Sequence, residues 1–181
     1  MKWLICRLSD FTPAEYEAVY GALSPSRRAH IDTFRHAGAR RQSLAGELAL
    51  RRLLAQEGMD ATPERLASGQ PVLRGSDLHV SITHCGELVA CAISGTPIGI
   101  DAEQIRPVKP GMPERVCTPE ELAWMQDSAE RFFEIWTAKE AYFKMVGTGI
   151  TDLRSVNILT LPRHVMREGD HLIQIVYKEK R

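Results

Sequence analysis

The chain is organised around residues 132–144, which read FFEIWTAKEAYFK. Apolar side chains recur along this stretch at helical spacing and form one face: Ile135, Trp136, Tyr142 and Phe143. Gly147 follows where a helix would end, so we predict a helix here. Glu140 and Lys144 are four residues apart and therefore lie on one helix face. A carboxylate one turn from an ammonium suits a site that holds a metal ion together with a phosphate, although an ordinary surface ion pair has the same spacing.

Length and composition allow one large domain or two small halves that share a core, since 44% of the 181 residues are apolar. Basic and acidic residues balance at 23 each, so no overall field favours nucleic acid or an anionic membrane. No apolar run is long enough for a membrane span, and the N-terminus lacks the features of an export signal. The four cysteines form no C-x-x-C pair, which indicates reduced thiols in a cytoplasmic protein.

Apolar periodicity and turn residues predict both helices and strands along the chain. Expected strands cover residues 2–8, 79–84, 88–93 and 98–103, with two more near 156–159 and 172–178. Expected helices follow Thr12-Pro13 and Ser24-Pro25, cover residues 39–56, and follow Thr118-Pro119 ahead of the central helix. Residues 59–78 are predicted to be a loop. The three strands between residues 79 and 103 have short connections, which predicts an antiparallel meander.

The separation of helices from strands indicates the α+β class rather than a doubly wound sheet. Helices followed by strands occur twice, so we expect two fused, similar α+β halves in which antiparallel strands pack against helices. We place the halves at residues 1–97 and 98–181. The active site is expected at their junction, with the metal site carried by the second half.

Two acidic residues lie in the expected strand Gly99-Ile100-Asp101-Ala102-Glu103. Asp101 and Glu103 are two residues apart, so their side chains leave the same face of the strand. Neighbouring carboxylates repel each other unless a cation lies between them, and a small set of oxygen ligands suits Mg²⁺. Two solvated acids at a strand end would give the same pattern.

A second polar stretch, Thr83-His84-Cys85-Gly86, lies at the tip of the preceding hairpin. A hydroxyl, an imidazole and turn amides can all donate hydrogen bonds, as a phosphate requires. A plain hairpin turn with a half-exposed histidine is equally consistent with it.

Three motifs follow one another in a fixed order at domain-like separations: Thr83-His84-x-Gly86, Gly99-Ile100-Asp101-x-Glu103 and Trp136-Thr137-x-Lys139-Glu140-Ala141-x-x-Lys144. This combination resembles the 4′-phosphopantetheinyl transferases, specifically the longer, Sfp-type enzymes. The resemblance runs from about residue 23 to about residue 156, most of the chain.

The resemblance implies a site for each part of the substrate coenzyme A and for Mg²⁺. Its metal ligands would be Asp101, Glu103 and Glu140. Its catalytic residues would be Glu140, Lys144 and Glu121, with Lys144 on the pyrophosphate of coenzyme A. Coenzyme A would be bound through Arg27, His30, Gln70, Thr83, His84, Asp101 and Lys144. Of these, Arg27, His30, Thr83 and His84 would lie near the nucleotide and its 3′-phosphate. Lys139 also matches the motif, but its place on the helix predicts that it points away from Glu140.

Three departures from the family pattern affect the expected coenzyme A affinity. Gln70 stands where the family usually has lysine, so one cationic contact is lost. Cys85 replaces a usual serine. His30 stands where a stronger base is common, which would make phosphate binding there depend on pH. Both carboxylate motifs are intact, so the chemistry is expected to be kept.

The resemblance implies that a serine of an acyl or peptidyl carrier protein attacks the β-phosphorus of coenzyme A. The serine receives the 4′-phosphopantetheine arm, and 3′,5′-ADP is released. Glu140, Glu121 or a metal-bound water would accept the serine proton. Fatty-acid, polyketide and peptide-synthetase carriers are all open as partners. Two alternatives remain: a non-catalytic coenzyme A-binding protein of the same fold, and an unrelated Mg²⁺-dependent phosphohydrolase.

Assembly and docking are further expectations. Shorter members of the family assemble as trimers, whereas two fused halves would need no partner copy, so we expect a monomer. Carrier proteins of this kind are typically acidic, so their docking face should be locally basic. Candidates for it are Arg40, Arg41, Arg51 and Arg52, which could equally be solvated helix charges.

Overall fold

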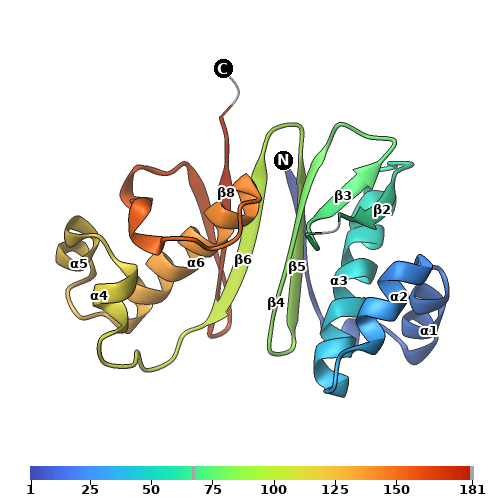
Figure 1. Ribbon diagram of the computed structural model, residues 1–181, viewed down its shortest axis with the longest axis horizontal. Coiled ribbons are helices and arrows are strands. Elements are labelled where there is room, and N and C mark those ends of the chain that lie inside the picture. Colours follow the sequence, from blue (N-terminus) through green and yellow to red (C-terminus); the bar gives the residue numbers. More distant parts are fainter. Residues whose placement is uncertain (67, 180–181) are drawn as a thin grey trace. The chain divides into compact units, whose positions relative to one another are not determined.

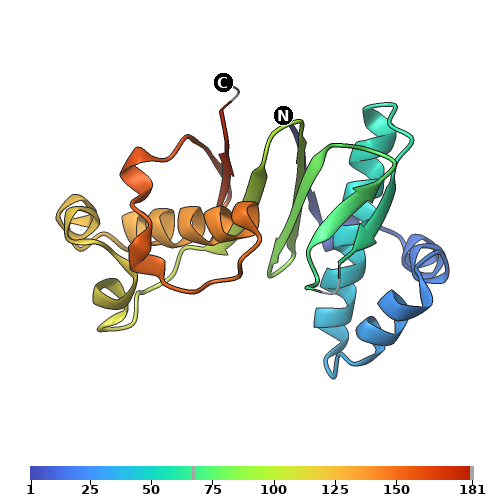
Figure 2. The ribbon, with the colours of Figure 1, turned by 45° about the horizontal axis from the view of Figure 1, so that its top comes forward.

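The computed structural model describes residues 1–66 and 68–179. It divides the chain into two compact units, Met1–Gly95 and Thr96–Arg181. This division falls two residues before the expected boundary between 97 and 98. Helices and antiparallel sheets make up both units (Figures 1 and 2), so the α+β class is confirmed.

Unit 1 is built on an antiparallel sheet of three strands in the order β1-β5-β4. These strands are β1 (Lys2–Arg7), β4 (His79–Cys85) and β5 (Leu88–Ser94). The unit's helices are α1 (Pro13–Gly21), α2 (Pro25–Asp32) and α3 (Ala37–Gln56), with a short 3₁₀ turn at Leu8–Asp10. All seven residues of β5 are buried, as expected for a strand covered on both faces.

The long helix α3 lies against this sheet and forms the core of unit 1 with it (Figure 1). A Cβ added at Gly46 would lie 2.9 Å from a side-chain carbon of Ile82 on β4, so the helix approaches the sheet closely there. Thr12 begins α1 with a capping box to Glu15, and Ser24 caps α2 by accepting the amide proton of Arg27. These caps explain why both helices begin where the sequence predicts.

Residues 59–78 were expected to be a loop, and this prediction is wrong. They contain an antiparallel pair, β2 (Thr62–Arg65) and β3 (Pro71–Arg74). Each strand has only four residues and carries a proline, which removes a ladder donor and hides the usual strand signal. Their pairing nevertheless places Arg65 at the end of β2, opposite Pro71.

Unit 2 holds a second antiparallel sheet, in the order β6-β8-β7. Its strands are β6 (Ile98–Gln104), β7 (Arg163–Glu168) and β8 (His171–Tyr177). Its helices are α4 (Met112–Val116), α5 (Pro119–Met125) and the central helix α6 (Ala129–Val146). Gly147 ends α6 in the left-handed conformation, with φ 73°, as the sequence predicts. Helix α6 packs against β6, as Figures 1 and 2 show.

Two further strand predictions are corrected by the structure. The expected meander ends at β5, because β6 pairs with β8 in the second sheet and not with β5. A short connection and an alternating pattern do not specify which strand is the partner. Residues 156–159 form no strand either. Asn157 accepts the amide proton of Leu159 at 3.0 Å and supports a 3₁₀ turn, Ile158–Thr160, after an earlier one at Leu153–Ser155.

No helix within residues 1–66 and 68–179 combines the length and apolar character that a membrane crossing needs. All four cysteines are thiols, and three of them are buried.

Candidate active site

The candidate site in unit 2 depends on a close approach between β6 and α6. A Cβ added at Gly99 would overlap the carbonyl oxygen of Ala141 and lie 2.7 Å from the backbone nitrogen of Met145. Only glycine therefore lets this strand face lie against the helix. Because side chains alternate along a strand, Asp101 and Glu103 leave β6 on the same face as Gly99. The sequence Gly-x-Asp-x-Glu thus directs both acids toward the side of the sheet that carries α6.

Asp101 and Lys144 form the central contact of this site. The Lys144 ammonium donates to Oδ1 of Asp101 at 2.6 Å. The Asp101 side chain is 5% exposed and that of Lys144 is 34% exposed, so the pair joins a buried carboxylate to a lysine that reaches the surface. The structure contains no Glu140–Lys144 ion pair among its described residues; the lysine instead bonds to the acid of the neighbouring strand.

Glu140 lies close to the same charges. Burial, together with the nearby carboxylates of Asp101 and Glu103, raises its pKa to about 7, and the nearby Lys144 ammonium opposes this shift. The structure therefore brings together three of the predicted residues around Glu140. Glu103 also pairs with Arg106 at 2.9 Å, and the Arg106 guanidinium stacks over the ring of Phe133.

The predicted metal ligands can be compared with this arrangement. Within the described part of the chain, no three His, Cys, Asp or Glu side chains are grouped as a ready-made metal site. Asp101 and Glu103 are held by Lys144 and Arg106 instead. The donor set still fits Mg²⁺ in its chemistry, since it consists of carboxylate oxygens whose mutual repulsion a divalent cation would offset.

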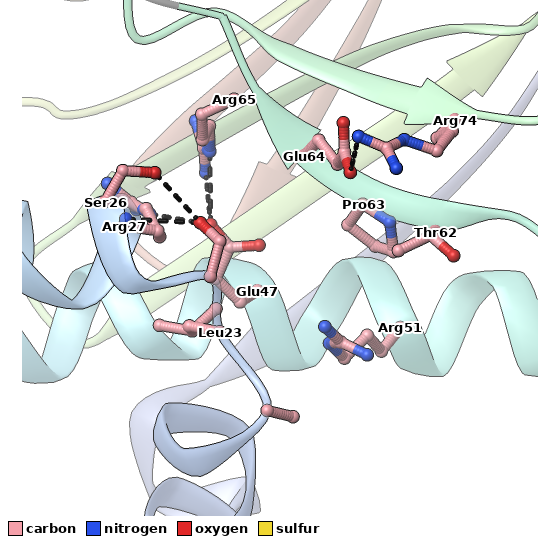
Figure 3. Close-up of a pocket in the computed structure, with 12 residues that line it drawn as sticks. Leu23, Ser26, Arg27, Glu47, Arg51, Thr62, Pro63, Glu64, Arg65 and Arg74 are labelled. Atoms are coloured by element: carbon pink, nitrogen blue, oxygen red, sulfur yellow. Dashed lines mark hydrogen bonds and ion pairs between the residues drawn. The ribbon is translucent and has the colours of Figure 1, made fainter.

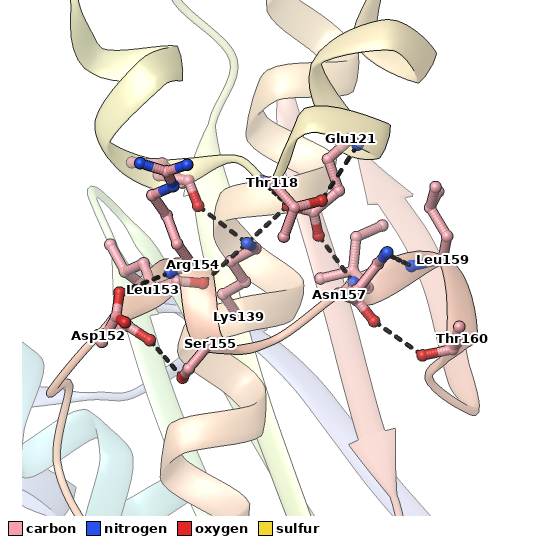
Figure 4. Close-up of polar contacts among 12 residues, drawn as sticks. Thr118, Glu121, Lys139, Asp152, Leu153, Arg154, Ser155, Asn157, Leu159 and Thr160 are labelled. Atoms are coloured by element: carbon pink, nitrogen blue, oxygen red, sulfur yellow. Dashed lines mark hydrogen bonds and ion pairs between the residues drawn. The ribbon is translucent and has the colours of Figure 1, made fainter.

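Glu121, the third predicted catalytic residue, lies in a separate buried network (Figure 4). Its carboxylate is 2.6 Å from the Lys139 ammonium, and both side chains are fully buried. One oxygen accepts the amide proton of Thr118 at 2.8 Å, and the other accepts that of Ile158 at 2.7 Å. Glu121 therefore caps α5 and fixes the segment around Ile158, and its two oxygens are engaged inside the core.

Lys139 completes this network. Its ammonium donates to the carbonyl oxygens of Val116 and Leu153, each at 2.8 Å, in addition to its ion pair with Glu121. The expectation that Lys139 points away from its neighbour Glu140 agrees with these contacts. The adjacent residues of the Lys-Glu pair thus have different surroundings: Lys139 is buried among structural contacts, and Glu140 lies among the acids of β6.

In unit 1 the predicted basic residue Arg27 is held by an acid that sequence reasoning missed (Figure 3). Glu47 on α3 is 2% exposed, and its Oε1 accepts from Arg27 Nε at 3.2 Å. The same oxygen accepts from Arg65 Nε at 3.1 Å. Arg27 also donates to Ser43 Oγ at 2.7 Å, and Arg65 donates to the carbonyl of Gly69 at 3.2 Å.

Arg27 and His30 line a common cavity of about 500 Å³ in unit 1. It is lined by Ser24, Ser26, Arg27, His30, Arg65, Leu66, Ser68 and Gly69. Gln70 is the next residue after this set, and its carbonyl accepts the amide proton of Leu66 at 2.9 Å. Thr83 and His84 are not among the residues that line it. They lie on β4, where Thr83 is buried and His84 is exposed on the opposite face.

Two signals could have revealed the residues that sequence analysis missed. Glu47 is the only acid in α3, inside an otherwise apolar run, and a lone buried acid requires a basic partner. Arg65 lies five residues before Gln70, but the loop predicted for residues 59–78 gave it no fixed neighbour. Recognition of the β2–β3 hairpin would have placed it.

Comparisons with known proteins agree with the motifs. Residues 97–177 match the model of the 4′-phosphopantetheinyl transferase superfamily. The chain is 36% identical over 119 residues to the 4′-phosphopantetheinyl transferase gsp of Aneurinibacillus migulanus, which covers 60% of this chain and 49% of that protein. It is 33% identical over 141 residues to psf-1 of Bacillus pumilus, with 71% and 60% covered. To Sfp of Bacillus subtilis strain 168 it is 26% identical over 147 residues, with 76% and 66% covered.

The sheet-and-helix unit that carries the strand acids thus coincides with the region, residues 97–177, that matches this superfamily. By these matches the chain is similar to the 4′-phosphopantetheinyl transferases, and the relatives that it resembles include Sfp itself. The chain spans about half to two thirds of the length of these curated relatives.

Proposed function

We propose that this protein transfers the 4′-phosphopantetheine group of coenzyme A to a serine of an acyl or peptidyl carrier protein and releases 3′,5′-ADP. The observation that supports this most is the cluster on β6 and α6. It places a surface-reaching ammonium, Lys144, on the buried carboxylate of Asp101, beside a crowded Glu140. Such a cluster suits a pyrophosphate substrate, because it offers an ammonium for the phosphate oxygens and acids that can hold a metal ion.

Asp101, Glu103 and Glu140 would hold a magnesium ion. When bound, the ion would polarise the pyrophosphate and neutralise charge on the leaving group. Lys144, once released from Asp101, would add its own positive charge to the same oxygens. These roles use no residue of the Glu121–Lys139 network.

The proton of the attacking serine needs an acceptor. Both oxygens of Glu121 are engaged in the core, with Lys139, Thr118 and Ile158. Of the two predicted carboxylates, Glu140 is therefore the one that we assign to proton transfer, and Glu121 becomes a positioning residue. The two similar halves, an active site at their junction, a monomeric state and a cytoplasmic location remain predictions that follow from the family resemblance.

The proposal is tested by measuring the release of the co-product, 3′,5′-ADP. The protein is incubated with coenzyme A, Mg²⁺ and a panel of apo carrier proteins, and the nucleotides are separated by chromatography. Transfer predicts that 3′,5′-ADP appears only when a carrier is present and in amounts equal to the modified carrier. Carrier-independent breakdown of coenzyme A would instead indicate a phosphohydrolase. Binding without any product would indicate a non-catalytic coenzyme A-binding protein.

A further inference from the structure

A glutamine lies in the apolar core of unit 2, beside an acid of the candidate site. Gln174 on β8 is 0% exposed, and its neighbours on the same face of that strand, Leu172 and Val176, are core residues. In the sheet register Gln174 stands opposite Asp101 of β6. Directly opposite residues of an antiparallel pair leave the sheet on one face, with their Cβ atoms about 5 Å apart. The buried amide is therefore a neighbour of the buried Asp101 carboxylate.

Only one end of this amide has a partner within the part of the chain that the structure describes. Nε2 donates to the carbonyl oxygen of Glu134 on α6 at 2.6 Å, so the amide nitrogen faces the helix. No described group donates to Oε1, although this atom is buried. A buried acceptor without a donor costs stability, whereas a methionine would fill the same space without that cost. The pattern indicates an oxygen that is kept for a donor from outside the chain.

The neighbouring acids determine what such a donor would be. Asp101 and Glu103 leave β6 on the face that Gln174 shares, and ionised carboxylates are acceptors as well. Acceptors that lie side by side need a donor or a cation between them. A Mg²⁺ ion keeps several of its water molecules when protein carboxylates hold it, and each water can donate a hydrogen bond. A hydrated ion on these acids would therefore supply the donor that Oε1 lacks.

We propose that Gln174 is a positioning residue of the magnesium site: its amide oxygen accepts a hydrogen bond from the hydration shell of the ion that the β6 acids hold. This inference rests on the proposed function in one respect, the presence of that ion at Asp101. Because Nε2 is bonded to α6, the amide connects the surroundings of the ion to the helix that carries Glu140 and Lys144. Groups that hold the ligands around a metal commonly contribute about ten-fold or more to its affinity.

The test is equilibrium binding of Mn²⁺, which takes the same oxygen ligands as Mg²⁺ and is counted by electron paramagnetic resonance of the free ion. Gln174→Met keeps the length of the side chain but removes the oxygen, so the affinity for Mn²⁺ should fall by about ten-fold. The Tm of this variant without metal should be unchanged or higher, by up to about 4 °C, because the acceptor without a donor is gone. The Glu134 carbonyl lies inside α6 and keeps its helical partner.

Two further variants separate this role from simple packing. Gln174→Glu keeps an oxygen acceptor at the same place and should bind Mn²⁺ at least as tightly as the wild type, whereas a packing role predicts weaker binding in both Gln174 variants. Gln104→Met is the matched control. Gln104 is exposed on β6, donates to Asp170 at 2.6 Å and leaves the strand on the opposite face, so affinity should change by less than about two-fold. Unchanged Mn²⁺ affinity in a folded Gln174→Met protein, or equal losses in both Gln174 variants, would overturn the inference.

These outcomes are separate from the fate of the proposed function. A wild type that binds Mn²⁺ but never transfers the group, with weaker binding in Gln174→Met, would keep this inference and reject the transferase. Transfer by the wild type, together with equal Mn²⁺ affinities of the wild type and Gln174→Met, would reject this inference alone.

Discussion

Glu140 has a pKa that its surroundings in the site raise well above the ordinary value. Its pKa of about 7 results from burial and from the neighbouring carboxylates of Asp101 and Glu103. A carboxyl whose pKa is raised in the folded state binds more protons there than in the unfolded state, so the protein loses stability as pH rises between the two pKa values. That window runs from the ordinary value of 4.5 to about 7.

The first prediction follows from this loss of stability with rising pH. In metal-free buffer with a chelator, the free energy of unfolding should fall by up to about 3 kcal/mol between pH 4.5 and 7, as far as Glu140 contributes. Glu140→Gln should remove that fall, while Glu17→Gln, at an exposed position of α1, should keep it. At pH 7, Mg²⁺ should raise the Tm of the wild type, because it supplies the missing cation. A wild-type curve that matches Glu140→Gln across this window would contradict the account.

At the element scale, the packing of β6 on α6 depends on one glycine. The second prediction is that Gly99→Ala destabilises the protein by at least about 3 kcal/mol, because the new methyl group meets helix backbone that cannot rotate away. Denaturant unfolding measures this. Gly38→Ala, near the start of α3, should change stability by less than about 1 kcal/mol in either direction, since a Cβ there meets no atom within 4 Å. Similar effects of the two substitutions would show that the close approach is not required.

The buried pair of Lys139 and Glu121 connects α6 to α5 and to the segment around Ile158. Lys139→Met should destabilise the protein by about 3–5 kcal/mol, because it leaves a buried carboxylate without its cation. The double variant Lys139→Met/Glu121→Gln should be less destabilised than the sum of the two single variants, since no uncompensated charge remains. Chemical denaturation of the four proteins gives the coupling energy. Simple additivity would show that the two groups do not depend on each other.

The sequence predicted the elements of the site better than their contacts. Strand alternation places Asp101 and Glu103 on one face, and helical spacing places Glu140 and Lys144 on one face. Neither pattern shows that Lys144 bonds to Asp101, because these two residues are 43 positions apart in the chain and lie on different elements. The β2–β3 hairpin was missed since its prolines hide the strand signal, and with it the position of Arg65. The pairing of β6 with β8 was missed because the residue pattern of one strand does not specify its partner strand.

At the scale of the whole molecule, each unit has its own sheet, central helix and core on a single chain. We therefore predict a monomer at working concentration, since no second copy is needed to supply either element pair. Sedimentation velocity should give one species with the mass of a single chain, unchanged over a ten-fold range of concentration. An obligate trimer would contradict this expectation.

The central claim is that the cluster on β6 and α6 transfers phosphopantetheine to a carrier serine. The most direct measurement is the intact mass of an apo carrier protein after incubation with coenzyme A, Mg²⁺ and the enzyme. We predict that the carrier gains the mass of one phosphopantetheine group with the wild type. A correctly folded Asp101→Ala variant should lose several kcal/mol of transition-state stabilisation, so its rate should fall roughly a thousand-fold or more. A carrier panel that gains no mass with the wild type, or that gains it equally fast with Asp101→Ala, would contradict the account.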